Sequence, residues 1–320
     1  MNTQPSLTII IPAYNEGASL HRLMQDVHQA LLAWPGEWGI ICVDDGSKDN
    51  TWSAIVALSV QFTRVQGLRF TRNFGKEAAI LAGLESATTD WVVVMDGDGQ
   101  HPPALLPEML ACAADPDVAI VAAKKRRRDS DSRVARVLSA GFNRLMLLAT
   151  GIDLANACDY RLLKRPVVQT LLQMPEKIRF FRAMTVWTGF KQHDLAFDVL
   201  PRMAGQTAWS TRGLIALAVQ GITGFSAKPL TIVFRLGIVG IFVSMALTAQ
   251  AMWSWSAGAA ISGWTSLTIV TVFFGSANLL GIGVLGTYLA QLFNEIKARP
   301  VYLLSARTAN HVPNVTKAGK

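Results

Sequence analysis

The stretch Trp91-Val92-Val93-Val94-Met95-Asp96-Gly97-Asp98-Gly99-Gln100 decides the fold class of this chain. The apolar residues predict a buried parallel strand, and two carboxylates one residue apart follow at its C-terminal end. In open α/β sheets that end faces the crevice in which ligands bind. Two carboxylates and an amide are hard oxygen ligands, suited to Mg²⁺ or Mn²⁺ held jointly with substrate phosphates, and the glycines allow close approach to the backbone. An acidic turn that closes a strand is the alternative, and the motif alone leaves both interpretations open.

Strand-like and helix-like segments alternate around this stretch. Apolar runs predict strands at 7–11, 38–43, 65–70, 91–95 and 118–122. Helical periodicity predicts helices near 19–32, with Ser19 as the N-cap, and near 51–62 and 77–86. This alternation indicates an α/β domain with a mostly parallel sheet.

Polar side chains follow four of these strands: Tyr14 and Glu16, Asp44 and Asp45, Arg72 and Lys76, and Asp96 and Asp98. Because the C-terminal ends of parallel strands share one crevice, the set predicts a single site. Cations and a metal suit a diphosphate, and carboxylates suit ribose hydroxyls and base N–H groups, so a nucleoside diphosphate is the expected ligand. A Rossmann dinucleotide site is disfavoured, since no glycine-rich turn follows the first strand.

The composition points to a membrane rather than to nucleic acid. The chain has 320 residues, 51% of them hydrophobic and 16% charged, with a formal net charge of +8. A basic balance fits nucleic acid, a membrane surface or an anionic substrate, and the apolar C-terminal third favours the membrane. The cysteines, Cys42, Cys112 and Cys158, match neither a disulfide framework nor a zinc site, which fits a reduced cytoplasmic compartment. We expect no cleavable signal peptide.

Two long apolar segments predict a membrane hairpin. Residues 236–294 contain no Asp, Glu, Lys, Arg or His. The apolar segments, about 232–255 and 265–293, each exceed the roughly 20 residues that cross a bilayer. Tryptophans frame the turn between them, and basic residues flank both outer ends, so both ends are expected to be cytoplasmic. A buried core hairpin of a soluble protein is the alternative.

The remaining segments carry weaker signals. Residues 124–136 are very basic and run into an apolar periodic segment, which fits either a helix on a membrane surface or a solvated loop with a core helix. Nucleic acid is not expected, because no aromatic residues interleave with the cluster. Residues 209–225 predict a second interfacial helix, residues 156–161 end a linker before another helix, and the tail from about Ala306 is expected to be mobile.

Four motifs in order resemble glycosyltransferase family 2: residues 11–16, 43–51, 72–77 and 96–103. More narrowly, the chain is similar to the polyprenyl-phosphate glycosyltransferases, the group of dolichol-phosphate mannose synthase and the bacterial bactoprenol glucosyltransferases. The similarity continues through Asp159-Tyr160-Arg161-Leu162 and Arg202-Met203-Ala204-Gly205 into the hairpin.

The resemblance implies a GT-A catalytic domain, Rossmann-like with a mostly parallel sheet, followed by amphipathic interfacial helices and a two-helix transmembrane hairpin. The expected boundaries are 1–205 for the catalytic domain (with a basic acceptor-side segment at 124–150), 206–229 for the interfacial helix, 230–295 for the hairpin and 296–320 for a cytoplasmic tail.

Site residues are implied by the same resemblance. Asp96, Asp98 and Gln100 would hold Mg²⁺ or Mn²⁺ on the donor diphosphate. Asp98 and Asp159 are the expected catalytic residues, and Asp159 is expected to position the acceptor more than to remove a proton. The expected substrate-binding residues are Pro12, Tyr14, Glu16, Asp44, Asp45, Arg72, Lys76, Asp96, Arg128, Arg133, Arg179 and Arg202.

Two departures from the family pattern matter. Gly97 stands where alanine is common, which is a small change. Thr207-Ala208-Trp209 stands where members often have Ser-Lys-Tyr. The lysine replaced by Ala208 would contact a phosphate, so Arg202, Arg179 or the 124–136 cluster would have to supply that charge.

The resemblance implies an inverting, metal-dependent transfer of a hexose from a nucleotide sugar, a UDP-sugar by expectation, to undecaprenyl phosphate. The reaction would take place at the cytoplasmic face of a bacterial inner membrane and serve surface glycan or lipopolysaccharide modification. The acceptor, a phosphate monoester with a second pKa near ~6, needs little help from a base.

Expected partners are the bilayer, a flippase or downstream glycosyltransferase, and a second copy of the chain, since Gly281, Gly283 and Gly286 permit close helix packing. One alternative is a processive polysaccharide synthase. Two helices are too few to build a translocation channel, and the Gln-x-x-Arg-Trp element is missing, so this alternative is disfavoured. The other is a non-catalytic membrane scaffold, against which the intact acidic and basic positions argue. The sequence leaves the sugar and the nucleotide open.

Overall fold

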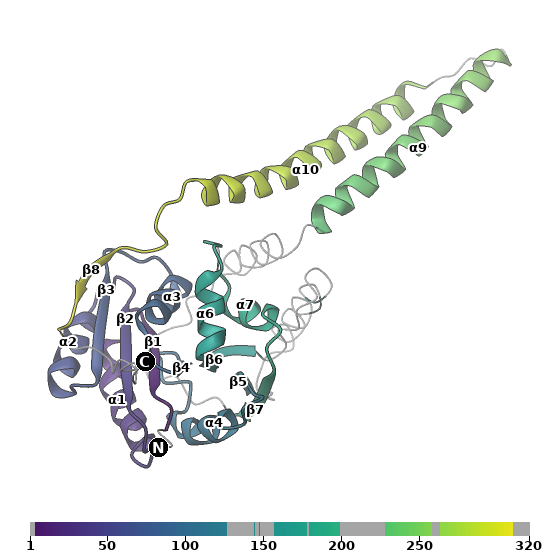
Figure 1. The fold of residues 1–320 in the computed structure, drawn as a ribbon. Helices are drawn as coiled ribbons and strands as arrows, with labels where there is room; N and C mark the ends of the chain where they lie inside the picture. The colour runs from purple at the N-terminus through teal and green to yellow at the C-terminus, as the bar shows by residue number, and fades with distance from the viewer. Residues whose placement is uncertain are drawn as a thin grey trace. The chain divides into compact units, whose positions relative to one another are not determined.

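A computed structural model describes residues 4–126, 144, 147, 157–177, 179–198, 228–257 and 263–309 (Figure 1). The chain divides into two units, which are described separately below. The first unit contains residues 1–147, 152–210 and 300–320, and the second contains residues 148–151 and 211–299.

One mixed sheet organises the first unit, with the strand order β7-β5-β6-β4-β1-β2-β3-β8 (Figure 1). The first four strands along the chain are β1 (Leu7–Ala13), β2 (Trp38–Asp44), β3 (Val65–Phe70) and β4 (Trp91–Val94). They pair in parallel, as the alternating segments predicted. The other strands are β5 (Ile120–Lys125), β6 (Ala157–Lys164), β7 (Gln192–Phe197) and β8 (Leu304–Arg307). Because β6 runs antiparallel to β4 and β5, and β8 runs antiparallel to β3, the sheet is mixed.

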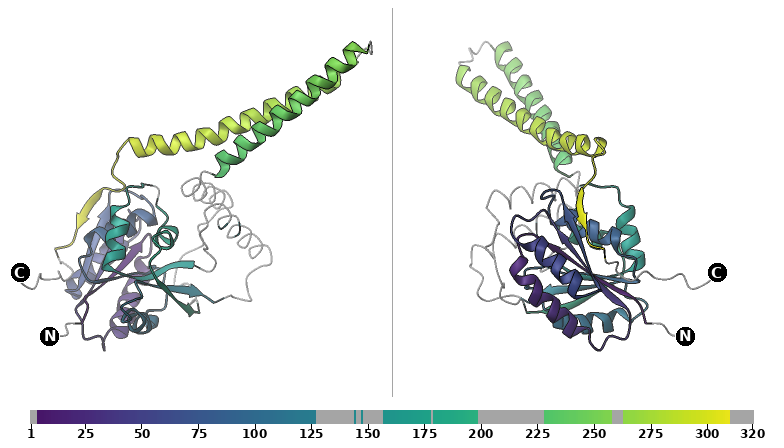
Figure 2. Two further views of the ribbon diagram at one scale, coloured as in Figure 1. Left: turned by 45° about the vertical axis from the view of Figure 1, so that its right-hand side comes forward. Right: turned by 90° about the vertical axis from the view of Figure 1, so that its left-hand side faces the viewer.

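Helices cover both faces of this sheet (Figure 2). Their bounds are α1 (Gly17–Ala30), α2 (Thr51–Gln61), α3 (Lys76–Ser86), a 3₁₀ turn η1 (Pro103–Leu105), α4 (Leu106–Ala113), α6 (Arg165–Gln173) and α7 (Phe181–Trp187). Alternate residues of β1, such as Ile9 and Ile11, share a buried cluster with apolar residues of α1, α2 and α4. Ile10 points to the opposite face, where Gly83 of α3 lies against it. A strand with both faces buried must be apolar throughout, which explains the continuous hydrophobic run of β1.

Three expectations about local structure are wrong. Ser19 is not the cap of α1 but lies inside the helix, where its hydroxyl donates to the carbonyl of Gly97 (2.8 Å). Residues 157–161 are not a linker but begin β6. The tail is ordered at Ala306 and Arg307, which belong to β8 and pair with β3.

The second unit contains the two predicted apolar helices, α9 (Lys228–Ser256) and α10 (Trp264–Ile296). The windows Leu230–Leu247 and Phe273–Phe293 are long and apolar enough to cross a membrane, and they are not buried within the protein. A Cβ built at Gly240 would lie 2.9 Å from the ring of Phe274, so small residues allow the two helices to approach each other. The predicted interfacial helix at 206–229 lies outside the described residues, apart from its last two positions, which begin α9.

Gly46 follows β2 at the C-terminal end of the parallel strands, where the chain passes close to the loop after β3. Its φ is +67°, and a Cβ there would lie 2.3 Å from the carbonyl carbon of Arg72 and 2.7 Å from the amide nitrogen of Asn73. Both contacts are backbone atoms and cannot swing away. Gly189 has a similar φ of +71° but nothing within 4 Å of such a Cβ.

We expect Gly46→Ala to lower the free energy of unfolding by roughly 2–4 kcal/mol, because backbone strain and overpacking add. Gly189→Ala carries only the strain and should cost about 1 kcal/mol. Thermal unfolding of the full chain in detergent compares the two. If both variants lost the same free energy of unfolding, the close approach of Gly46 to the backbone of Arg72 and Asn73 would not constrain the fold.

Candidate active site

The C-terminal ends of the parallel strands bring the predicted polar residues to one edge of the sheet. Asp45 follows β2, Lys76 begins α3, and Asp96 lies two residues beyond the end of β4. The antiparallel register of β4 and β6 pairs Val94 with Arg161. Continued by two residues, the same register sets Asp96 opposite Asp159. The sheet therefore places two carboxylates from distant parts of the sequence side by side.

Two cations hold these carboxylates. The Lys76 Nζ lies 2.5 Å from Asp96 Oδ1 and 2.5 Å from Asp159 Oδ2. Arg182, the second residue of α7, donates from Nε to Asp159 Oδ1 (2.7 Å) and from Nη2 to Oδ2 (2.9 Å). We refer to Lys76, Asp96, Asp159 and Arg182 as the Lys76 cluster. Its two positive and two negative charges balance formally.

The Lys76 cluster keeps all its members charged. Burial alone would raise the pKa of Asp159, but the charges of Lys76 and Arg182 and their hydrogen bonds hold it well below its usual value. The pKa of Asp96 is also lowered, against burial, chiefly by the positive charge of Lys76. Burial would lower the pKa of Lys76, yet Asp159 and Asp96 raise it above its usual value. A carboxylate with so low a pKa is a weak general base, which supports a positioning role for Asp159.

His101 supports Asp96 from behind. Its Nδ1 accepts the backbone N–H of Asp96 (3.0 Å), and its Nε2 lies 3.7 Å from Asp96 Oδ2. The imidazole is buried and stacks on Tyr160, with ring centroids 5.0 Å apart. Burial lowers the pKa of His101 despite the opposing charge of Asp96, so the ring is neutral. Sequence analysis missed this residue, although it directly follows the acidic motif.

Glu77 was also missed. It follows Lys76 in the first turn of α3, and its Oε2 accepts the backbone N–H of Phe181 (2.8 Å), the first residue of α7. Burial and the negative charge of Asp159 raise the pKa of Glu77 to about 7, although the N–H of Phe181 and the charge of Lys76 oppose the rise.

Asp44 and Asp45, expected near the nucleoside, bind the loops that follow the C-terminal ends of the parallel strands. Asp44 is fully buried, accepts the N–H of Ser47 (2.8 Å) and pairs with Arg69 (3.3 Å). Asp45 accepts the N–H groups of Phe74 (2.7 Å) and Gly75 (3.0 Å), and burial raises its pKa despite these two bonds. These carboxylates hold the loops that follow β2 and β3.

Residues that follow β1 form hydrogen bonds with the segment that follows β2. Tyr14 is 41% exposed, and Asn15 accepts the N–H of Lys48 (2.9 Å). The backbone N–H of Glu16 donates to Thr51 Oγ1 (2.9 Å). Pro12 pairs with Val43 in the parallel ladder. The nucleoside-binding roles of Pro12, Tyr14, Glu16, Asp44 and Asp45 stay predictions.

The acidic motif has the donor chemistry of a metal site. Asp98 is largely buried, and its Oδ1 accepts the N–H of Gln100 (3.0 Å). A Cβ at Gly97 would lie 2.3 Å from Glu16 Oε2, so the glycine lets this carboxylate approach the motif. In the described part of the chain no three His, Cys, Asp or Glu side chains gather closely enough to hold a metal. A metal bound between Asp96 and Asp98 would take its remaining ligands from other oxygens, such as those of an amide or of a phosphate ligand, which suits Mg²⁺ or Mn²⁺.

The predicted basic residues fall into different places. Arg179 donates to the carbonyls of Leu171 (2.5 Å) and Met174 (3.1 Å) at the end of α6. Arg72 lies over the ring of Phe74, 4.1 Å from its centroid. Three predicted basic residues lie outside the described part of the chain: Arg128, Arg133 and Arg202. Ala208, which was singled out for a different reason, lies outside it as well. Arg182, the second residue of α7, was not among the predicted site residues.

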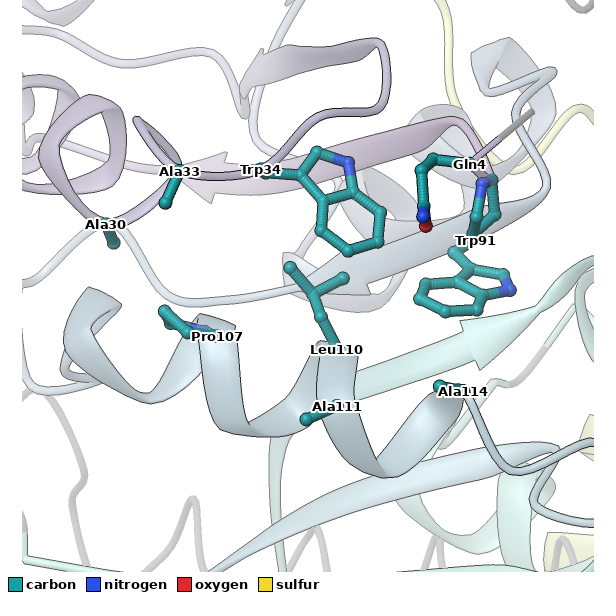
Figure 3. Close-up of a pocket in the computed structure, with 10 residues that line it drawn as sticks. Gln4, Ala30, Ala33, Trp34, Trp91, Pro107, Leu110, Ala111 and Ala114 are labelled. Atoms are coloured by element: carbon teal, nitrogen blue, oxygen red, sulfur yellow. The ribbon is translucent and has the colours of Figure 1, made fainter. Parts of the chain in front are cut away.

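A cavity of about 460 Å³ lies away from these residues (Figure 3). It is lined by Trp34, by Trp91 at the start of β4 and by Leu110 of α4. None of the predicted site residues lines it, and the start of β4 is the opposite end of the strand from Asp96. The cavity is therefore separate from the candidate site.

The chain is similar to a known protein family and to several known proteins. Residues 8–172 match the family model described as glycosyl transferase family 2. An uncharacterised glycosyltransferase of Synechocystis is 34% identical over 301 residues, which cover 93% of this chain and 94% of that protein. A prophage bactoprenol glucosyl transferase homologue of Escherichia coli K12 is 34% identical over 303 residues, 93% of this chain and 98% of that protein. A solved mannosyltransferase of Pyrobaculum calidifontis with GDP-Man and Mn²⁺ is 17% identical with a TM-score of 0.45, covering 93% of this chain and 89% of that one.

Glu77→Gln should stabilise the protein more at pH 8 than at pH 5. The folded-state pKa of about 7 exceeds the ordinary value of 4.5, so the native state binds the proton more tightly than the unfolded state does. Stability from this group is therefore lost as pH rises between these two values, and glutamine removes that loss. Melting temperatures of wild type and variant at both pH values test this, with the exposed Glu108→Gln as control. A difference independent of pH would contradict it.

Proposed function

Since the chain belongs to glycosyl transferase family 2, we propose that this glycosyltransferase moves a hexose from a nucleotide sugar to a polyprenyl phosphate. The observation that carries the proposal is the Lys76 cluster, in which one ammonium contacts both Asp96 of the acidic motif and Asp159. Whole-length similarity to a protein named as a bactoprenol glucosyl transferase homologue supports a polyprenyl acceptor.

On the donor side, the acidic motif would hold the diphosphate of a nucleotide sugar through Mg²⁺ or Mn²⁺. Asp96, Asp98 and Gln100 would supply oxygen ligands, and such a metal would contribute positive charge to offset the negative charge of the departing diphosphate. His101 fixes the backbone and the carboxylate of Asp96. Lys76 adds a positive charge beside that carboxylate, where a phosphate group of the donor would be attracted.

On the acceptor side, the nucleophile is a phosphate oxygen, which is already largely ionised at neutral pH. It would attack the anomeric carbon while the bond from that carbon to the nucleoside diphosphate breaks, so the configuration inverts and no base is required. Arg182 and Lys76 offer the positive charge that draws the phosphate in. Asp159, ionised and bonded to both, holds these two cations in place.

The two apolar helices suit an acceptor that never leaves a membrane. We propose that α9 and α10 anchor the enzyme as a hairpin in a bacterial inner membrane, with the catalytic unit on the cytoplasmic face. A UDP-sugar donor and undecaprenyl phosphate are the substrates we expect. Sharing the membrane with the acceptor confines the enzyme's search to two dimensions.

The test is product analysis on membranes containing the full chain. Membranes are incubated with a panel of nucleotide sugars and undecaprenyl phosphate, with Mn²⁺ or with EDTA, and the lipid products are identified by mass. We expect one hexose per polyprenyl phosphate, formed from one donor and only with the metal. A polymer, or no lipid product with any donor, would overturn the proposal.

Asp98→Asn should lower turnover roughly a hundredfold or more, because one of two metal-binding carboxylates is lost. Excess Mn²⁺ should restore EDTA-treated wild type but not this variant. Asp117→Asn serves as the matched control, since Asp117 is an exposed carboxylate that pairs with Lys191 elsewhere on the unit. Full turnover by Asp98→Asn with normal membrane content would show that the acidic motif is not the metal site.

A further inference from the structure

Glu77 is an ionisable residue in a place where negative charge is costly. It lies half-buried beside Lys76 in the first turn of α3, where the negative charge of Asp159 acts on its carboxylate. Enclosing an anion next to another anion destabilises both unless donors and cations compensate. The compensating donor is the backbone N–H of Phe181, 104 residues away in sequence (2.8 Å). A carboxylate kept in such a costly position suggests a specific structural role.

The role we infer is to hold the start of α7, whose first backbone N–H donates to the Glu77 carboxylate. Phe181 is the first residue of α7, and Arg182 is the second. The first N–H groups of a helix have no acceptor within it, so an external carboxylate fixes where the helix begins. Arg182 must be placed accurately, because both of its bonds to Asp159 depend on the plane of the guanidinium.

A second contact holds the same helix further along the chain. Arg161 of β6, which is buried, donates to Thr185 Oγ1 (2.6 Å) in the last turns of α7. Loss of the Glu77 contact would therefore free the start of α7 while its middle stays attached to the sheet. The change would be local to Phe181 and Arg182, and the unit would stay folded.

We propose that Glu77 is a positioning residue, which sets the start of α7 and thereby the hold of Arg182 on Asp159 at the acceptor side of the site. Adjacent residues of α3 thus control Asp159 from two directions. Lys76 bonds it directly, and Glu77 acts on it through α7. The inference rests on the proposed function only for its kinetic readout.

The experiment compares Glu77→Ala with Glu77→Gln in steady-state kinetics of the full chain, varying the nucleotide sugar and undecaprenyl phosphate in turn. Alanine removes the acceptor of the Phe181 N–H, and the KM for undecaprenyl phosphate should rise roughly tenfold. The KM for the nucleotide sugar should stay within about twofold. Glutamine keeps an acceptor oxygen and should restore the lipid KM to within about threefold of wild type.

Controls separate positioning from general damage. Glu108→Ala removes an exposed carboxylate of α4 and should leave both KM values unchanged. Arg182→Lys keeps the charge but loses the paired geometry. If Glu77 acts through Arg182, the double variant Glu77→Ala, Arg182→Lys should be no worse than Arg182→Lys alone.

Three results would overturn the inference: equal rises in both KM values, glutamine as harmful as alanine, or multiplying effects in the double variant. These outcomes require an active wild type. An inactive wild type would instead count against the proposed function, so the two failures are distinguishable.

Discussion

The ammonium of Lys76 between Asp96 and Asp159 is the contact on which the site depends. Without it, two enclosed carboxylates from neighbouring strands would face each other, and one would have to take up a proton. With Lys76 and Arg182 present, both stay ionised and the formal charge is balanced. The sheet register, which sets Asp96 opposite Asp159, makes this geometry a property of the fold.

Sequence reasoning predicted the parallel half of the sheet because its signals are local. The run 91–95 and its partners are apolar on both faces and end in polar residues, so strand ends and site residues could be placed together. It missed β6 and β8 because their pairing is not local. β8 pairs with a strand more than 230 residues earlier in the chain. The residues Leu304–Arg307 alone do not form a pattern that predicts a strand. Long-range pairing of short segments leaves little trace in the segments themselves.

The candidate site divides in the same way. Asp96, Asp98 and Lys76, the residues predicted to lie near the donor, were selected because they closely follow strands. His101, Glu77 and Arg182 were not, because each acts through a contact that only the folded chain creates. Arg182 also bears on the family lysine that Ala208 replaces: the structure brings this arginine to Asp159, whereas Arg179, selected beforehand, bonds to the end of α6. Supporting residues are harder to recognise than ligands because their spacing in sequence has no pattern.

We propose that one lysine, Lys76, serves both halves of the reaction. The direct measurement is the steady-state kinetics of Lys76→Gln, with each substrate varied in turn and with Lys191→Gln, an exposed lysine paired to Asp117, as control. If Lys76 joins the donor and acceptor sides, the KM values for the nucleotide sugar and for the polyprenyl phosphate should both rise while kcat falls, and the control should match wild type. A change confined to one substrate would contradict the account.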